Sequence, residues 1–335
     1  MTSDVSRVAA AFVEERLPTA RGLGAALADL IEDPEAFTRS LTEGLQLLAD
    51  PGYEQEQGRI APGSGATIGV RWPLVHAIER ALKRPLGESS SSSALWLAQR
   101  LARSEYREVR LFSLPALRRT LPDDPERAWQ LMRRLARGAN DWISVDSLAD
   151  VYAVGILAEP FRWAEIEQLV YSQHRMERRL VGSTLARLPY CLTPAARRAG
   201  AVAAIAPRAL SIVAQLIGDA DDQVQKALSW AIREWSRVAP EQAVQLLQDQ
   251  TRIAADTQDG NRAWVIRDAV ALIDPGVAAD IRSRLTGIRR RPGATSTSPA
   301  GLAAATFLAA AAGTDDTLTD RAVAMQGQRF ARRSA

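Results

Sequence analysis

The sequence predicts an all-α fold. Between residues 94 and 287 the apolar side chains recur at i, i+3, i+4 and i+7, and almost no segment shows the alternation of a strand. Prolines in the first turn mark three helix starts, at Pro125, Pro194 and Pro240. In chain order, the clearest helical stripes run over Leu95–Leu101, Ala128–Leu135, Val145–Leu157, Ile166–Tyr171 and Val224–Trp235.

Three similar segments suggest that the helices form a repeat. They begin at Glu108, Glu177 and Gln223, and each opens with a polar or basic turn before an apolar stretch. Each is followed by a break and a second helix, the breaks being marked by Pro122, Pro189 and Pro240. Helix pairs that repeat in this way predict a HEAT-like repeat α-solenoid, a curved array with a concave surface for a long partner.

Shifts in composition divide the chain into three parts. We expect N-terminal helices and a loop over residues 1–67, a repeat domain over 68–287 and a flexible Arg/Ala-rich tail over 288–335. Pro51–Gly65 is rich in Gly and Pro and predicts a loop. The serine run Ser89–Ser93 predicts a flexible surface connection.

Composition excludes several classes of protein. The chain carries 42 basic and 39 acidic residues, so its net charge of +3 is no signature of nucleic-acid binding by itself. One cysteine excludes an internal disulfide, and two histidines argue against a metal cluster. The longest apolar run, Leu302–Ala312, is too short to span a bilayer, and no secretory signal is evident. We expect a soluble, cytoplasmic monomer without a cofactor.

The first candidate site is the helix start at Trp142. Asp141 or Asn140 can cap this helix, and Val145, Leu148, Tyr152 and Ile156 form its predicted buried stripe. Trp142 and Asp146 then lie one turn apart, about 40° from each other around the helix. The alternative is a packing indole next to a solvated acid that the helix dipole favours.

Two further segments carry candidate contacts. The run from His174 to Arg179 is cationic at a helix start, which suits phosphate binding, although such runs are often simply solvated. Trp230 lies about 140° from the predicted core residue Trp235, so it is either on a contact surface or packed on a neighbouring repeat. The other tryptophans are predicted to be core residues: Trp72, Trp96, Trp129, Trp163 and Trp264.

Together these segments resemble the HEAT-like-repeat DNA alkylation-repair glycosylases of the AlkD type, from about residue 68 to about residue 245. The segments that carry the resemblance are Ile68–Pro73, Ser104–Glu108, Trp142-Ile-Ser-Val-Asp146-Ser and Lys226-Ala-Leu-Ser-Trp230-Ala-Ile-Arg233-Glu234. Two departures from the family motifs are Ile143 in place of an acidic residue and Met176 in place of an aromatic one.

The resemblance implies a function and a set of site residues. The implied function is a monofunctional DNA N-glycosylase that releases cationic N3- or N7-alkylated purines from duplex DNA held in a concave groove. The implied catalytic residues are Asp146, Trp142 and Trp230. The implied DNA contacts are Arg179 or its neighbour Arg178, with Lys226 and Arg233.

Two alternatives remain at the level of sequence. One is a HEAT-like scaffold that keeps the fold and binds DNA or protein without catalysis. The other is a protein–protein adaptor with no role in nucleic-acid binding. The carboxylate at Asp146 favours the enzyme, because a scaffold has no need of it.

Overall fold

The structure, a computed structural model, describes residues 4–307. Within this range it contains helices joined by turns and loops, and no β-strand; one isolated bridge pairs Ala66 with Tyr106. The predicted all-α repeat fold is confirmed. No helix in the described range combines the length and the apolar character needed to cross a membrane.

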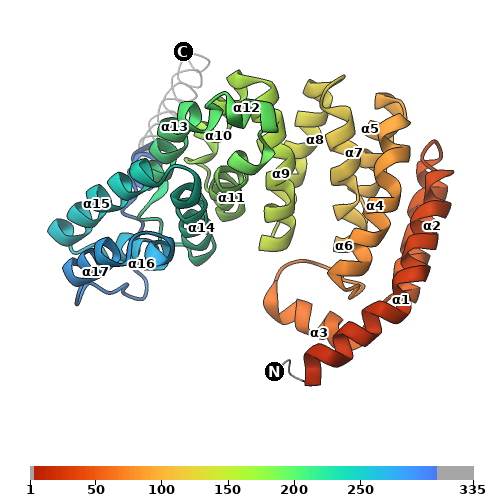
Figure 1. The fold of residues 1–335 in the computed structure, drawn as a ribbon, viewed down its shortest axis with the longest axis horizontal. Coiled ribbons are helices and arrows are strands. Elements are labelled where there is room, and N and C mark those ends of the chain that lie inside the picture. The colour runs from red at the N-terminus through yellow and green to blue at the C-terminus, as the bar shows by residue number, and fades with distance from the viewer. Residues whose placement is uncertain (1–3, 308–335) are drawn as a thin grey trace, which may run out of the picture.

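The helices follow one another along an arch, in chain order (Figure 1). The first are α1 (Asp4–Ala28), α2 (Pro34–Leu47), α3 (Pro51–Ile60), α4 (Trp72–Glu88), α5 (Ser91–Leu101), α6 (Arg107–Leu111), α7 (Ser113–Thr120) and α8 (Pro125–Gly138). The central ones are α9 (Trp142–Ala158), η1 (Pro160–Arg162), α10 (Trp163–Leu169), α11 (Arg175–Cys191), α12 (Pro194–Arg198), α13 (Ala201–Leu216) and α14 (Asp222–Val238). The last are α15 (Pro240–Thr257), α16 (Gly260–Ala269), η2 (Val270–Leu272) and α17 (Pro275–Arg284).

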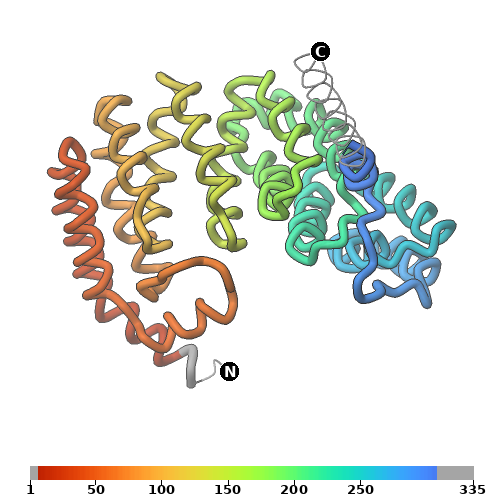
Figure 2. Tube along the Cα trace, turned by 180° about the vertical axis from the view of Figure 1, so that it is seen from behind, coloured from red at the N-terminus to blue at the C-terminus, as the bar shows by residue number. Residues whose placement is uncertain are grey.

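Three helices in the middle of the arch, α9, α11 and α14, pack side by side. The view from behind shows the same order, with the red N-terminal helices and the blue C-terminal ones at opposite ends (Figure 2). Residues 33 and 44 positions apart in sequence thus come together on neighbouring helices, as in the bonds from Arg179 to Asp146 and to Gln223.

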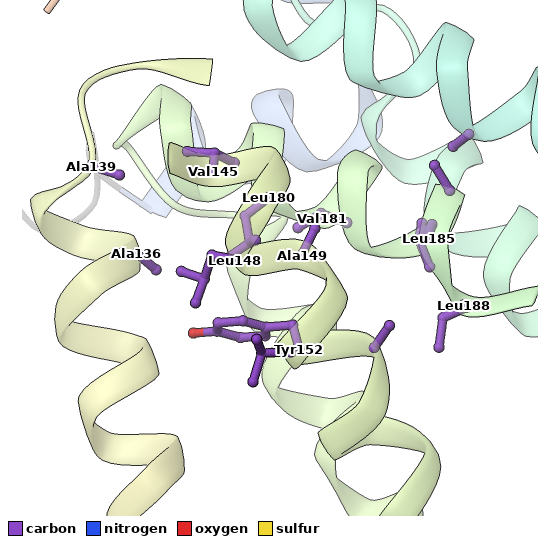
Figure 3. Packing of buried hydrophobic residues seen from close by; sticks show 14 of the residues in the cluster. Ala136, Ala139, Val145, Leu148, Ala149, Tyr152, Leu180, Val181, Leu185 and Leu188 are labelled. Carbon is purple, nitrogen blue, oxygen red and sulfur yellow. The ribbon is translucent and has the colours of Figure 1, made fainter. Parts of the chain in front are cut away.

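The apolar stripe predicted for α9 fixes this helix in place. Val145, Leu148, Tyr152 and Ile156 are each no more than 2% exposed. The first three lie in one cluster with side chains of α8 and α11 (Figure 3). Complete burial of one such large apolar side chain contributes about 1.5–3 kcal/mol, so the cluster holds α9 firmly against α11.

α11 and α14 approach each other closely at Gly182. A Cβ there would lie 2.8 Å from the Cβ of Ala227 and 2.9 Å from its carbonyl carbon. Gly182→Ala is therefore expected to lower the free energy of unfolding by about 1–3 kcal/mol, as overpacked cores do. Thermal unfolding measures the change. Gly22→Ala on α1 is the control, because its Cβ meets nothing within 4 Å and is expected to stabilise the helix slightly. Equal melting temperatures for the two variants would contradict the close approach.

Two of the sequence predictions for loops are wrong. Two thirds of Pro51–Gly65 is helix α3 (10 residues), because Asp50 caps it by accepting the N–H groups of Gly52 and Tyr53 at 3.0 and 3.3 Å. The serine run starts helix α5 instead of forming a connection: the Ser90 hydroxyl accepts the N–H of Ser93 at 3.0 Å. In both cases a side-chain cap outweighs a composition typical of loops.

The tryptophans predicted to be core residues differ in burial. Trp129 and Trp163 are buried, and Trp72 and Trp264 are partly buried against the core. Trp96 is 60% exposed, so its assignment to the core is wrong. Its neighbours on α5, Leu95 and Leu97, are buried; a helix of this kind has room for one core-facing stripe, and Trp96 lies outside it.

A buried carboxylate joins two of the segments on which the family resemblance depends. The two carboxylate oxygens of Glu108 accept the N–H groups of Ile68 and Gly69 at 3.1 and 3.0 Å. Gly69 has a φ of +80°, and a Cβ there would lie 2.6 Å from Glu54 Cβ, so only glycine fits. The turn before α4 is therefore held by the start of α6.

Residues 288–300 pack back against the repeat domain. The Thr297 N–H donates to the carbonyl of Gly218 at 2.9 Å, and the Asn261 side chain donates to the carbonyl of Thr295 at 3.1 Å. Ser298 and Ala300 are completely buried. The sequence predicts a flexible tail from residue 288 onward; the part of that tail beyond residue 307 lies outside the described residues.

Candidate active site

The start of α9 is set by its cap. The Asp141 carboxylate accepts the backbone N–H and the hydroxyl of Ser144, at 3.0 and 2.7 Å. Trp142 is thereby the first residue of α9. Asp146 and Asp150 follow at steps of four residues, so all three lie along one side of the helix, away from its buried stripe.

Asp146 forms a two-pronged ion pair with Arg179 of α11. Arg179 Nε donates to Asp146 Oδ1 at 3.0 Å and Arg179 Nη2 donates to Oδ2 at 2.7 Å. The Ser183 hydroxyl, one turn further along α11, donates to Oδ1 at 2.6 Å. The carboxylate is held by three hydrogen bonds, which fix both its position and its orientation.

Arg179 also reaches α14. Its Nη1 donates to the backbone carbonyl of Gln223 at 2.8 Å and to Oε1 of the same residue at 3.2 Å. These bonds and the two to Asp146 engage four of the five N–H donors of the guanidinium. The Arg179 side chain is 6% exposed and that of Asp146 is 19% exposed, so the carboxylate is the more accessible partner.

Trp142 is fixed beside this ion pair. Its indole N–H donates to the carbonyl of Ile60, the last residue of α3, at 3.0 Å. The Arg179 Cζ lies 5.9 Å from the centroid of the Trp142 ring, at the outer limit of a cation–π contact. The structure thus brings Trp142, Asp146 and Arg179 together; Arg179, which the family resemblance implies as a DNA contact, here pairs with Asp146.

Trp230 lies further along α14 with a different set of partners. It is partly buried against the core, and its indole N–H donates to Glu234 Oε1 at 3.1 Å. Glu234 also accepts from the Tyr190 hydroxyl and from Arg237. Burial raises the pKa of the Glu234 carboxyl, but these hydrogen bonds outweigh that effect and the pKa lies below its usual value. Trp230 is seven residues after Gln223, or about 10 Å along the helix.

Two of the remaining predicted DNA contacts, Arg178 and Arg233, have protein partners, whereas the Lys226 side chain has none in the described residues. Arg178 donates to Asp219 at 2.7 Å and to two carbonyls of the loop before α11, so it ties that loop in place. Arg233 pairs with Asp268. Lys226 is exposed, and within the described residues its ammonium group has no ion-pair or hydrogen-bond partner. Of the two neighbouring arginines, Arg179 is the one that lies against Asp146.

Comparison with known proteins identifies the family of this chain. The family model described as "DNA alkylation repair enzyme" matches residues 41–273. The chain belongs to the DNA alkylation repair enzyme family. Among solved structures, a predicted DNA alkylation repair enzyme from Enterococcus faecalis is similar at 12% identity and a TM-score of 0.48, covering 71% of this chain and 97% of that chain. A search among curated proteins finds no match.

Two residues of this alkylation repair family member were missed by the sequence analysis. Ser183 follows Arg179 by four residues, so helical spacing alone places both on one side of α11. Gln223 contributes mainly through its backbone carbonyl, for which the sequence carries no signal. A second pair, Asp150 with Arg187, lies one turn along α9 from Asp146 and is more exposed.

No metal site accompanies these residues. Among residues 4–307 no group of three or more His, Cys, Asp or Glu side chains is placed to hold a metal ion.

Proposed function

We propose that the protein is a monofunctional DNA N-glycosylase that releases N3- or N7-alkylated purines from duplex DNA. The observation that carries the proposal is the Asp146 carboxylate, fixed by three hydrogen bonds, partly exposed and next to Trp142. The bound DNA would lie along the inner side of the arch, as the family resemblance implies.

Release of a cationic alkylpurine requires a carboxylate near the sugar and no general acid. A purine alkylated at N3 or N7 is already cationic, so it departs without protonation by a general acid. As the bond from C1′ to the base breaks, positive charge develops on the deoxyribose, and a fixed carboxylate stabilises that charge. The same carboxylate can orient the water that attacks C1′. The product is an abasic site and a free base.

The hydrogen bonds leave one position on Asp146 for the substrate. Oδ1 accepts from Arg179 and Ser183, whereas Oδ2 accepts from Arg179 only. A carboxylate offers about four lone-pair positions, so Oδ2 keeps one for the sugar or the water. Since Arg179 is the more buried partner, an approaching sugar meets the carboxylate first. In this proposal Arg179 positions Asp146.

In this proposal both indoles contact the DNA, Trp142 beside the carboxylate and Trp230 further along the array. Trp142, held by the Ile60 carbonyl, offers a rigid ring next to Asp146. Trp230 is held by Glu234 about two turns along α14 from Gln223. Aromatic rings at these places favour contact with a sugar that carries developing positive charge.

Lys226 is the proposed contact to a DNA phosphate. Its ammonium is free and exposed on α14, one turn before Trp230. Lys226→Ala is expected to weaken binding to duplex DNA and to reduce the slope of log K against log salt by about 0.9, the value for one phosphate contact. Binding titrations over a series of salt concentrations measure the slope. Lys83→Ala, which removes the other exposed lysine, is the control and is expected to leave the slope unchanged.

Incubation with duplex DNA that contains N7-methylguanine tests the proposed function. We expect chromatography to show free 7-methylguanine, and mild alkali to cleave the DNA at the abasic site left behind. Absence of both products under conditions in which the DNA is bound would contradict the proposal.

One observation favours a second candidate, a DNA-binding scaffold without catalysis. Arg179 neutralises the charge of Asp146, and a carboxylate paired in this way can serve packing alone. The scaffold predicts binding to methylated duplex DNA with no release of the base, so the same incubation separates the two.

A further inference from the structure

A second candidate site lies on the other side of α9 from Asp146. A cavity of about 830 Å³ lies between α5, α7, α8 and α9, and the segment at Gly63–Gly65 also lines it. α9 contributes Ser144 and Leu148 to its wall. These two residues are each about 160° around the helix from Asp146, so α9 separates the cavity from the candidate active site.

The charged side chains of the cavity are mostly cationic. Arg103 and Arg134 are exposed, and in the described part of the chain neither guanidinium has a hydrogen-bond or ion-pair partner. Arg110 donates to the carbonyls of Ser64 and Glu105, at 2.8 and 2.7 Å. The one carboxylate in the lining, Asp141, is engaged in capping α9. The cavity therefore has two free guanidinium groups and no free carboxylate to balance them.

The rest of the wall is apolar with two amides. Leucines on α7, α8 and α9 provide the apolar surface, among them Leu114, Leu131 and Leu148. Gln99 and Asn140 add amide groups with both donors and acceptors. A ligand that fits must combine an anionic group with a flat or apolar body that carries hydrogen-bonding edges. The volume suits a small organic molecule, since ligand pockets commonly measure about 300–1,000 Å³.

We propose that this cavity is a binding site for a nucleotide, with the phosphate on Arg103 and Arg134 and the base between the leucine wall and the two amides. Arginine is suited to this role because its planar donors match phosphate oxygens. The nucleotide can come from two sources, a free nucleotide or one nucleotide of bound DNA turned out of the helix. Because the cavity is separate from Asp146, nucleotide binding there can be tested independently of the proposed release of the base.

Binding experiments on the full chain test the site and separate the sources. The variant is Arg103→Ala with Arg134→Ala. The control is Arg39→Ala with Arg118→Ala, which removes the same charge from two exposed arginines outside the cavity. In the first arm, calorimetry measures binding of 2′-deoxyguanosine 5′-monophosphate. In the second arm, the fluorescence of 2-aminopurine placed in an undamaged duplex reports whether a base leaves the stack.

For a free nucleotide we expect the wild type to bind the monophosphate, the cavity variant to bind it at least about tenfold more weakly, and the control to bind it as the wild type does. For a nucleotide of DNA we expect a rise in 2-aminopurine fluorescence on binding, lost in the cavity variant and kept in the control. Either pattern supports the proposal. It is overturned if neither arm gives a signal with the wild type, or if the cavity variant and the control behave alike in both arms.

Discussion

Asp146→Asn is expected to slow the release of 7-methylguanine from methylated duplex DNA by about 100- to 1,000-fold, the range seen when one fixed electrostatic group is removed from an active site. The amide keeps the shape of the carboxylate but loses the negative charge that stabilises the sugar cation. Affinity for DNA should change little, because Asp146 makes no attractive contact with phosphate. Single-turnover base release and a binding titration measure the two quantities separately.

The same substitution also affects folding, and a matched variant separates the two effects. Arg179 is only 6% exposed, and without Asp146 its charge is left without a carboxylate, at a cost of about 3–5 kcal/mol. Asp150→Asn is the control: its pair with Arg187 is 38% and 35% exposed, so we expect a loss below about 1 kcal/mol and no change in base release. Wild-type rates from a folded Asp146→Asn variant would remove Asp146 from the mechanism.

Arg179→Ala is expected to destabilise the protein about as much as Asp146→Asn does. It removes both bonds to Asp146 and both bonds to Gln223, so α9, α11 and α14 lose these hydrogen bonds and keep their apolar packing. Breaking a largely buried ion pair costs about 3–5 kcal/mol. Urea unfolding measures the loss, and base release is measured at a temperature where the variant is folded.

Kinetics distinguish the positioning role of Arg179 from a phosphate contact. If Arg179 positions Asp146, kcat falls while KM and the salt dependence of binding stay near the wild-type values. Arg179→Lys should then restore part of kcat, because a lysine keeps the charge but cannot make the two parallel bonds. A salt slope reduced by about 0.9, with kcat unchanged, would instead show that Arg179 meets a phosphate.

Local signals in the sequence were sufficient for the central helices and for part of the site. The buried stripe of α9 predicted which side of the helix was left for Trp142 and Asp146, and the structure places them there. The choice between Arg178 and Arg179 was not possible from sequence, because each finds its partner on another helix or loop: Asp219 for the first and Asp146 for the second.

Interhelical partners explain the remaining differences. Arg233, which the family resemblance implies as a DNA contact, pairs with Asp268, 35 residues later in the chain, and the sequence carries no signal for this partner. Gln223 holds Arg179 through a backbone carbonyl, which any residue type provides. Side-chain periodicity assigns a residue to a face of its helix, but it does not say which residue lies opposite.

The packing of residues 288–300 bears on how the protein can be shortened. This segment contacts Asp259, Asn261 and Arg262, which are all less than 7% exposed. In a fragment that ends at residue 273, the polar groups of these three residues would be exposed to water. Fraying would then start at α16 and reach α14, whose first turn holds Arg179 through Gln223. The C-terminal segment therefore acts as the end-cap of the array, and we expect a stable fragment to extend at least to Ala300.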